Sequence, residues 1–118
     1  MGKNKLKRFA DMETMSCVFQ PDRSMIDNDS FPLKGKWHQN YFKNENPIVI
    51  ELGCGKGEYT VGLGKRYPNK NYIGLDIKGA RIWEGANTVR EEDLKNIGWV
   101  RTRIEFVDSF FAPKEVDD

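Results

Sequence analysis

The spacing of apolar residues along the chain changes at Pro47. Before that point apolar positions are scattered, whereas the remaining residues alternate short apolar runs with amphipathic stretches. Continuous apolar runs rich in β-branched residues are typical of strands that are buried on both faces. The pattern therefore predicts strands over 47–53, 71–77 and 97–107, separated by helices over 57–68 and 79–96.

This alternation of strands and helices indicates βαβ units, which place parallel strands in one sheet with right-handed crossovers. The helix over 79–96 supports the assignment, because Ile82, Ala86 and Val89 form an apolar stripe along one side of it. We therefore expect an α/β fold of the Rossmann-like type, with a parallel sheet between layers of helix. Lys78 and Arg81, at the start of this helix, are interpreted as surface charges.

Residues 1–46 form a different region, which opens with Lys3, Lys5, Lys7 and Arg8. The residues that follow are turn formers with little periodicity. Leu33, Trp37 and Tyr41 then recur at helical spacing, so we expect a basic, extended arm that ends in a short helix over 33–42. His38 and Trp37 are interpreted as packing residues. The predicted organisation is thus an arm and helix over 1–46, followed by a sheet domain over 47–118.

The predicted strand order has a consequence for the strand over 47–53. In a doubly wound sheet the first strand lies in the middle and is paired on both sides. Three strands in the order third, second, first leave one edge of that apolar strand with unpaired N–H and C=O groups. We therefore expect these 118 residues to be the first part of a longer protein, truncated after about three parallel strands. The alternative is a small complete domain that is closed by a second copy, as a homo-oligomer.

Three glycines, Gly53, Gly55 and Gly57, lie between the first strand and the helix that follows it. Glycine tolerates the positive φ angles of a tight turn and lets a ligand approach the backbone. A P-loop is excluded, because Gly64-Lys65 is followed by arginine and lacks the earlier glycine. A dinucleotide fingerprint requires its third glycine at the position of Glu58. The remaining candidate is GxGxG preceded by an acidic residue, which is the form found in methyltransferases.

Two carboxylates flank this loop, and they favour a cationic ligand over a phosphate. Glu51 precedes the first glycine by two positions, and Asp76 ends the next predicted strand. S-adenosylmethionine carries an ammonium, a sulfonium and a ribose diol, all of which suit carboxylates. Asp76 can accept hydrogen bonds from both ribose hydroxyls, although it can also cap the helix that begins near Gly79. Cys54 is interpreted as a small residue that fits the turn.

Composition narrows the class of protein without naming a partner. The chain is 38% hydrophobic and 31% charged, with a formal net charge of +1. It has no apolar run near the roughly 20 residues that a membrane span requires. Two cysteines far apart and a single histidine argue against a disulfide framework and a structural metal, and they agree with a reducing compartment. We therefore expect a cytoplasmic protein that binds neither membrane nor metal.

The stretch "IELGCGKGEYTVGLGKRYPNKNYIGLDIKGAR" resembles the TrmB-type tRNA (guanine-N7)-methyltransferases, and the likeness extends from about Trp37 to Phe111. The resemblance implies a class I methyltransferase fold, S-adenosylmethionine as cofactor, and methylation of a guanine in the variable loop of tRNA. The cofactor-binding residues that it implies are Glu51, Gly53, Cys54, Gly55, Gly57, Asp76, Ile77 and Arg103. The basic start of the chain is similar to arms that contact tRNA in that family.

Two features depart from the family's pattern. Arg103 occupies the position where the family usually has an acidic residue or asparagine that contacts the adenine, and arginine has no hydrogen-bond acceptor. Either the backbone over 102–104 recognises the adenine, with Arg103 pointing away or stacking on it, or Glu105 substitutes for it. In that family the motif most closely tied to catalysis lies at the end of the next strand, after the position of Asp118. No catalytic residue is therefore assigned in this sequence. Two other functions stay open: a cofactor- or RNA-binding module without activity, and half of an NAD-dependent Rossmann domain that uses Asp76 for ribose.

Overall fold

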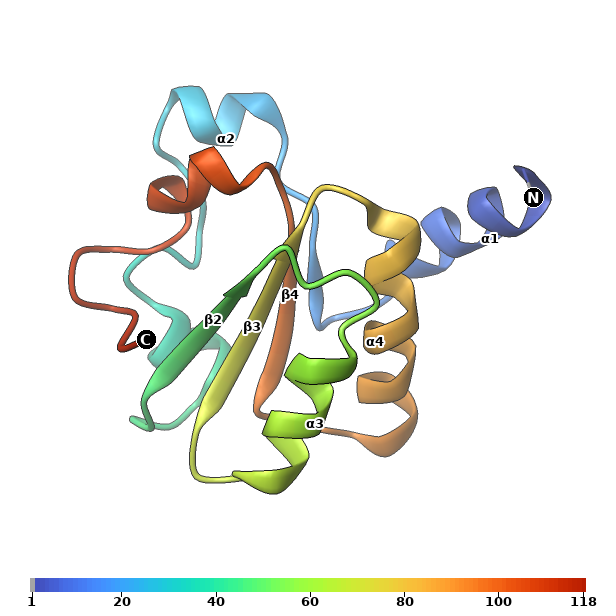
Figure 1. Cartoon of the computed structure of the whole chain (residues 1–118). Helices are drawn as coiled ribbons and strands as arrows, with labels where there is room; N and C mark the ends of the chain where they lie inside the picture. The colour runs from blue at the N-terminus through green and yellow to red at the C-terminus, as the bar shows by residue number, and fades with distance from the viewer. Residues whose placement is uncertain (1) are drawn as a thin grey trace.

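In the computed structural model, which describes residues 2–118 with side chains from residue 5 onward, four parallel strands form one sheet. The order across the sheet is β1-β4-β3-β2, and every neighbouring pair is parallel (Figure 1). The strand bounds are Val18–Phe19 for β1, Ile48–Leu52 for β2, Asn71–Asp76 for β3 and Ile97–Arg101 for β4. The parallel α/β architecture predicted from the sequence is confirmed.

Helices cover both faces of this sheet. α3 (Glu58–Arg66) and α4 (Gly79–Glu92) pack on one face, and α1 (Gly2–Met12) lies against α4 (Figure 1). A turn of π-helix, η1 (Trp37–Phe42), covers the other face together with the C-terminal segment. Two short helices, α2 (Arg23–Asp27) and the 3-10 helix η2 (Ile104–Ser109), contact each other above the carboxyl ends of the strands.

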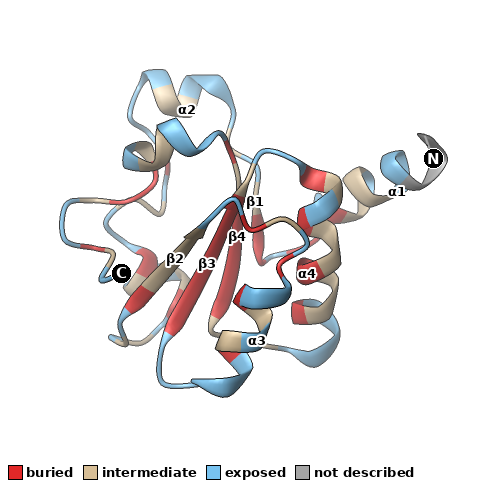
Figure 2. Cartoon of the chain, viewed as in Figure 1, coloured by how far each residue is buried: buried red, intermediate tan, exposed pale blue. Residues whose placement is uncertain are grey.

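The hydrophobic core has two halves, one on each face of the sheet. β3 and β4 alternate between them, since Trp99 packs toward α4 and Val100 packs toward η1. Buried residues concentrate on β3 and β4, whereas β2 is only partly buried (Figure 2). The central strands are therefore held from both sides, which fixes the positions of their carboxyl ends.

The N-terminal region differs from the extended arm expected from the sequence. α1 is a helix of 11 residues, and β1 adds a fourth strand through the backbone pairing of Val18 with Trp99. The expected helix over 33–42 is confirmed in its second half only, as η1. The last predicted strand ends at Arg101 instead of 107, because the chain turns there into η2. The boundary between the two predicted domains stays a prediction.

The outer edge of β2 is not left open as the sequence suggested. The amide of Asp117 donates to the Ile48 carbonyl at 2.8 Å, and the amide of Ile50 donates to the Asp118 carbonyl at 2.9 Å. The Asp117 carboxylate also accepts the Ile48 amide at 2.8 Å. These bonds cover part of an edge that was expected to be unpaired, and they place the C-terminal residues alongside β2 (Figure 1).

Candidate functional site

The candidate site lies at the edge of the sheet where the strands β2, β3 and β4 end. The pairing register sets Leu52 opposite Leu75 and Asp76 opposite Arg101, so the three carboxyl ends lie together. The glycine loop, residues 53–57, continues from β2 at this edge. The amides of Gly53 and Cys54 both donate to the Leu75 carbonyl, at 2.8 and 3.0 Å, which fixes the loop beside the end of β3.

The glycines of this loop serve different purposes. All three have positive φ angles: 75° at Gly53, 56° at Gly55 and 76° at Gly57. A Cβ at Gly55 would meet no atom within 4 Å, so that position opens to solvent. A Cβ at Gly57 would collide with the indole ring of Trp99. Glycine is therefore required at position 57 for packing, and the backbone that a ligand can reach is that of Gly53 and Gly55.

Trp99 fits into a slot that is lined by glycines from three elements. A Cβ at Gly74 or at Gly85 would come within 2.6 Å of the same ring. Together with Gly57, these positions let the glycine loop, β3 and α4 approach the fully buried indole. The buried Trp99 ring thus packs against the C-terminal end of the glycine loop, which the sequence pattern did not reveal.

Asp76 braces the loop with both oxygens of its carboxylate. Oδ2 accepts the Gly55 amide at 2.8 Å, and Oδ1 accepts the Lys78 amide at 2.9 Å, where α4 begins. The alternative role expected for Asp76, as a cap for the following helix, is not formed: the N-cap residue of α4 is Lys78, α4 has no side-chain cap, and of this helix Asp76 accepts only the amide of that N-cap residue. Because a carboxylate offers about four lone-pair sites, Asp76 retains acceptor capacity for a ligand.

Glu51 is held in place by a neighbouring helix. The Thr60 hydroxyl on α3 donates to Glu51 Oε1, and Thr60 itself is 1% exposed. Cys54 lies near both carboxylates. Its pKa is raised to about 12, mainly by burial and further by the negative charges of Asp76 and Glu51. The thiol is therefore protonated at neutral pH and cannot act as a nucleophile.

A cavity of about 370 Å³ opens beside Asp76 at the carboxyl ends of β3 and β4. Ile77 and Ile104 are large apolar side chains on its lining, and they are 49% and 42% exposed. Exposed apolar side chains that face a cavity are typical of ligand sites. The full lining is Gly53, Asp76, Ile77, Thr102, Arg103, Ile104 and Glu105.

The structure brings four of the predicted cofactor-binding residues into this cavity: Gly53, Asp76, Ile77 and Arg103. Gly55 adjoins it through its bond to Asp76, whereas Glu51 and Cys54 lie outside the lining. The sequence analysis missed the Ile104 side chain, whereas it offered Glu105 as a substitute for Arg103 at the adenine. One signal in the sequence could have identified Ile104. It is an isoleucine that follows the polar residues at the end of β4 and is not part of a buried apolar run.

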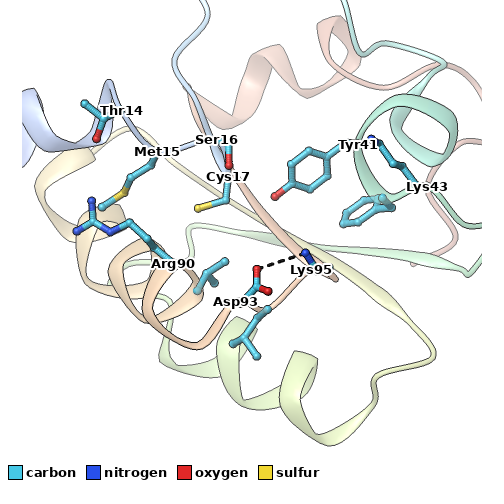
Figure 3. Close-up of a pocket in the computed structure, with 12 residues that line it drawn as sticks. Thr14, Met15, Ser16, Cys17, Tyr41, Lys43, Arg90, Asp93 and Lys95 are labelled. Carbon is cyan, nitrogen blue, oxygen red and sulfur yellow. Dashed lines mark ion pairs between the residues drawn. The ribbon is translucent and has the colours of Figure 1, made fainter.

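A second cavity, of about 500 Å³, lies at the opposite edge of the sheet (Figure 3). It is bounded by the connector from α1 to β1, the end of η1 and the connector from α4 to β4. The Tyr41 hydroxyl points into it and donates to the Ile97 carbonyl at 2.7 Å. Burial raises the pKa of the Cys17 thiol, which also faces this cavity, to about 11. No functional residue was predicted from the sequence in this region.

Among residues 2–118, no helix combines the length and apolar character that crossing a bilayer requires. The same part of the chain contains no group of three or more potential metal-ligating side chains. His38, interpreted as a packing residue, makes a 2.8 Å hydrogen bond between its Nε2 and the Asn46 carbonyl.

Comparisons with known proteins agree on one kind of enzyme. Residues 45–118 match the model of a family described as "Putative methyltransferase". All 118 residues align with the tRNA (guanine-N(7)-)-methyltransferase of Bacteroides fragilis, at 56% identity over 47% of that protein. A tRNA (guanine-N(7)-)-methyltransferase of Christiangramia forsetii is 54% identical over 99% of this chain and 52% of its own. The chain thus spans about half the length of these curated relatives.

Solved structures provide a comparison of fold alone. A structure described as an antibiotic related methyltransferase superposes on 64% of this chain and 40% of its own, with a TM-score of 0.54 and 20% identity. The parallel sheet with flanking helices is therefore a methyltransferase fold, as the sequence analysis expected.

Proposed function

Because this chain belongs to the methyltransferase family that its residues 45–118 match, we propose that it forms the cofactor-binding half of a tRNA (guanine-N7)-methyltransferase. The observation that carries the proposal is the Asp76 carboxylate, which borders an apolar-walled cavity beside an exposed glycine backbone. The proposed methyl donor is S-adenosylmethionine, and the proposed substrate is a guanine in the variable loop of tRNA. A cytoplasmic location, where tRNA is available, accompanies this function.

The residues around the cavity suit the parts of this cofactor. Asp76 retains the lone pairs to accept the ribose hydroxyls. Ile77 and Ile104 offer apolar walls for a planar adenine. The backbone of Gly53 and Gly55 leaves room for the methionine portion, and Glu51 supplies negative charge near its ammonium. Glu105, rather than Arg103, offers acceptors for the adenine amino group, because arginine can only donate.

The bound cofactor supplies an electrophilic methyl group, and guanine N7 is already a nucleophile. This half of the protein therefore has to bind and orient rather than move a proton. Fixed orientation can lower a barrier by several kcal/mol. The packing of Trp99 against the glycine loop and the two hydrogen bonds of Asp76 hold in place the backbone that would orient the cofactor. No catalytic acid or base is proposed among these residues.

Binding and methyl transfer are tested with the protein expressed from its complete gene. Calorimetry should detect binding of S-adenosylhomocysteine and no binding of NAD. Methyl transfer from labelled S-adenosylmethionine is then followed on an unmodified tRNA transcript, with a transcript that has adenine in place of the variable-loop guanine as control. Label should appear as 7-methylguanosine in the first transcript only.

The possible outcomes separate the competing functions. A preference for NAD would overturn the methyltransferase proposal, and half of a dehydrogenase would replace it. Binding of S-adenosylhomocysteine without transfer to tRNA would point to a binding module. Equal labelling of both transcripts would reject the proposed target guanine while leaving the cofactor in place.

A further inference from the structure

The contact between α1 and α4 pairs one acidic side chain of each helix with an arginine of the other. The Arg8 guanidinium forms an ion pair with Glu84 at 2.9 Å, donates to the Ala80 carbonyl at 3.2 Å and lies over the Trp83 ring. Asp11 is paired with Arg90 at 2.8 Å and accepts the Trp83 indole N–H at 2.7 Å. Arg8, expected from the sequence to contact RNA, is therefore engaged within the protein.

Four other cations near this contact have no acidic partner among the described side chains: Lys5, Lys78, Arg81 and Arg101. Lys5 and Arg101 both lie over the Phe9 ring, with their charged groups 5.8 and 4.7 Å from its centre. Arg101 donates to the carbonyl of Ile77, the residue before Lys78, and Arg81 follows in the first turn of α4. We call these four residues the α1–α4 basic surface.

The opposite flank of the cofactor cavity has the reverse charge. α2 and η2 contact each other there, and Arg23 pairs with Asp27 at 3.0 Å while lying over the Phe106 ring. Five acidic side chains lie in and around these two helices, against three cations, Arg23, Lys34 and Arg103, and Lys34 is paired with Asp29 at 2.8 Å. The five are Asp22, Asp27, Asp29, Glu105 and Asp108. The cavity thus lies between a basic flank and an acidic flank, although the chain as a whole has a formal net charge of only +1.

We propose that the α1–α4 basic surface binds the phosphate backbone of the RNA substrate and directs it to the cavity from the α4 flank. The inference rests on the proposed function and adds the side from which the RNA approaches. Clustered cations attract a polyanion and release its counterions, whereas the acidic α2–η2 flank repels it. Lys78 and Arg101 adjoin the cavity, because Lys78 directly follows the lining residue Ile77 and Arg101 directly precedes the lining residue Thr102.

The test is a double variant, Lys78→Gln with Arg81→Gln, in the protein expressed from its complete gene. Its dissociation constant for tRNA, measured by fluorescence anisotropy over a range of salt concentrations, should rise roughly 10- to 30-fold at about 150 mM salt. The slope of log affinity against log salt should fall by about two units, since each lost phosphate contact removes about one. Affinity for S-adenosylhomocysteine should not change.

A matched control removes the same charge elsewhere. Lys36 and Arg66 are exposed, belong to neither α1 nor α4, and have no ion pair with a described side chain. Lys36→Gln with Arg66→Gln should leave the tRNA affinity and the salt slope unchanged.

Three results would overturn the proposed surface, and they differ in what else they reject. If the unsubstituted protein binds tRNA and both double variants keep its affinity and its salt slope, the proposed surface is rejected. The proposed function would not be affected by that result. Failure of the unsubstituted protein to bind or methylate tRNA would reject the proposed function and the surface with it. An equal loss of affinity in both double variants would replace the surface with a general effect of net charge.

Discussion

The two edges of the sheet each carry a cavity, and the smaller one is the better candidate for a ligand site. The cavity beside Asp76 measures about 370 Å³ and the one beside Tyr41 about 500 Å³. At the second edge three polar side chains are paired with protein: Tyr41 with a backbone carbonyl, Arg90 with Asp11, and Lys95 with Asp93, the last pair shown in Figure 3. At the first edge Asp76 retains acceptor capacity next to exposed isoleucines. Exposed isoleucines and a bare glycine backbone beside a carboxylate, and not volume, separate the two.

Among the substitutions that test this contrast between the two cavities, we expect the largest effect from a substitution of Asp76. Asp76→Ala should weaken binding of S-adenosylhomocysteine by about 100-fold or more, because two charge-assisted hydrogen bonds are worth about 1.5 to 3 kcal/mol each. Tyr41→Phe removes a hydroxyl at the other edge and should leave that affinity unchanged. Calorimetry on the protein from the complete gene measures both. A similar loss of affinity for S-adenosylhomocysteine in the two variants would contradict the assignment of the ligand site to the edge beside Asp76.

The next effect concerns stability and separates two glycines of one loop. Gly57→Ala adds a methyl group against Trp99 at a positive φ, so we expect the free energy of unfolding to fall by roughly 2 to 5 kcal/mol. Gly55→Ala meets no neighbouring atom and should cost only the backbone strain, about 1 to 2 kcal/mol. Urea denaturation measures the difference. Equal losses would mean that the indole slot adjusts to a methyl group.

Each edge also holds a buried thiol, which predicts a loss of stability at high pH. The pKa values of Cys17 and Cys54 are raised from 9.0 to about 11 and about 12 by burial. The folded state therefore retains these protons after the unfolded state has lost them. Stability is complete below pH 9 and declines above it, by about 1.4 kcal/mol per pH unit for each thiol. The decline from Cys17 ends near pH 11, and that from Cys54 continues to about pH 12.

Urea denaturation between pH 8 and about pH 10.5 tests this decline. Cys17→Ala and Cys54→Ala should each make it shallower, because alanine does not ionise. If the slope were the same in the single variants and in the unsubstituted protein, the thiols would not be the cause.

The smallest expected effect is at Thr60, which positions Glu51 without lining the cavity. Thr60→Val keeps the shape of the side chain and removes the hydroxyl, so binding of S-adenosylhomocysteine should weaken about three- to tenfold. Thr60→Ser retains the hydroxyl and should restore most of the affinity. Calorimetry distinguishes positioning from packing, because a packing role would make the serine variant at least as weak as the valine variant.

The sequence predicted the parts of the fold that depend on local periodicity. β2, β3, α3 and α4 are long and strongly patterned, and their bounds differ little from those expected. α1 and β1 were missed for different reasons. β1 has two residues, too few to show a pattern, and it exists because Val18 pairs with β4. α1 is stabilised by its contacts with α4, which no local pattern reveals.

The candidate site was predicted unevenly for a similar reason. Asp76 and the glycine loop follow directly from strand ends, so sequence order alone places them together. The roles of individual glycines depend on what lies opposite in space, and Trp99 is distant from Gly57 in the sequence. Lys78 and Arg81 were interpreted as isolated surface charges, because their neighbours on α1 could not be known before the two helices were seen in contact.

The glycine-lined slot around Trp99 has a consequence for how this protein can diverge. Gly57, Gly74 and Gly85 accommodate one indole ring, so a larger residue at any of them requires a smaller residue at position 99. These four positions, drawn from a loop, two strands and a helix, should covary as one group among homologues. Substitution of one glycine alone carries the full steric cost, whereas a lineage that exchanges the tryptophan first removes the shortest of the contacts that restrict each glycine.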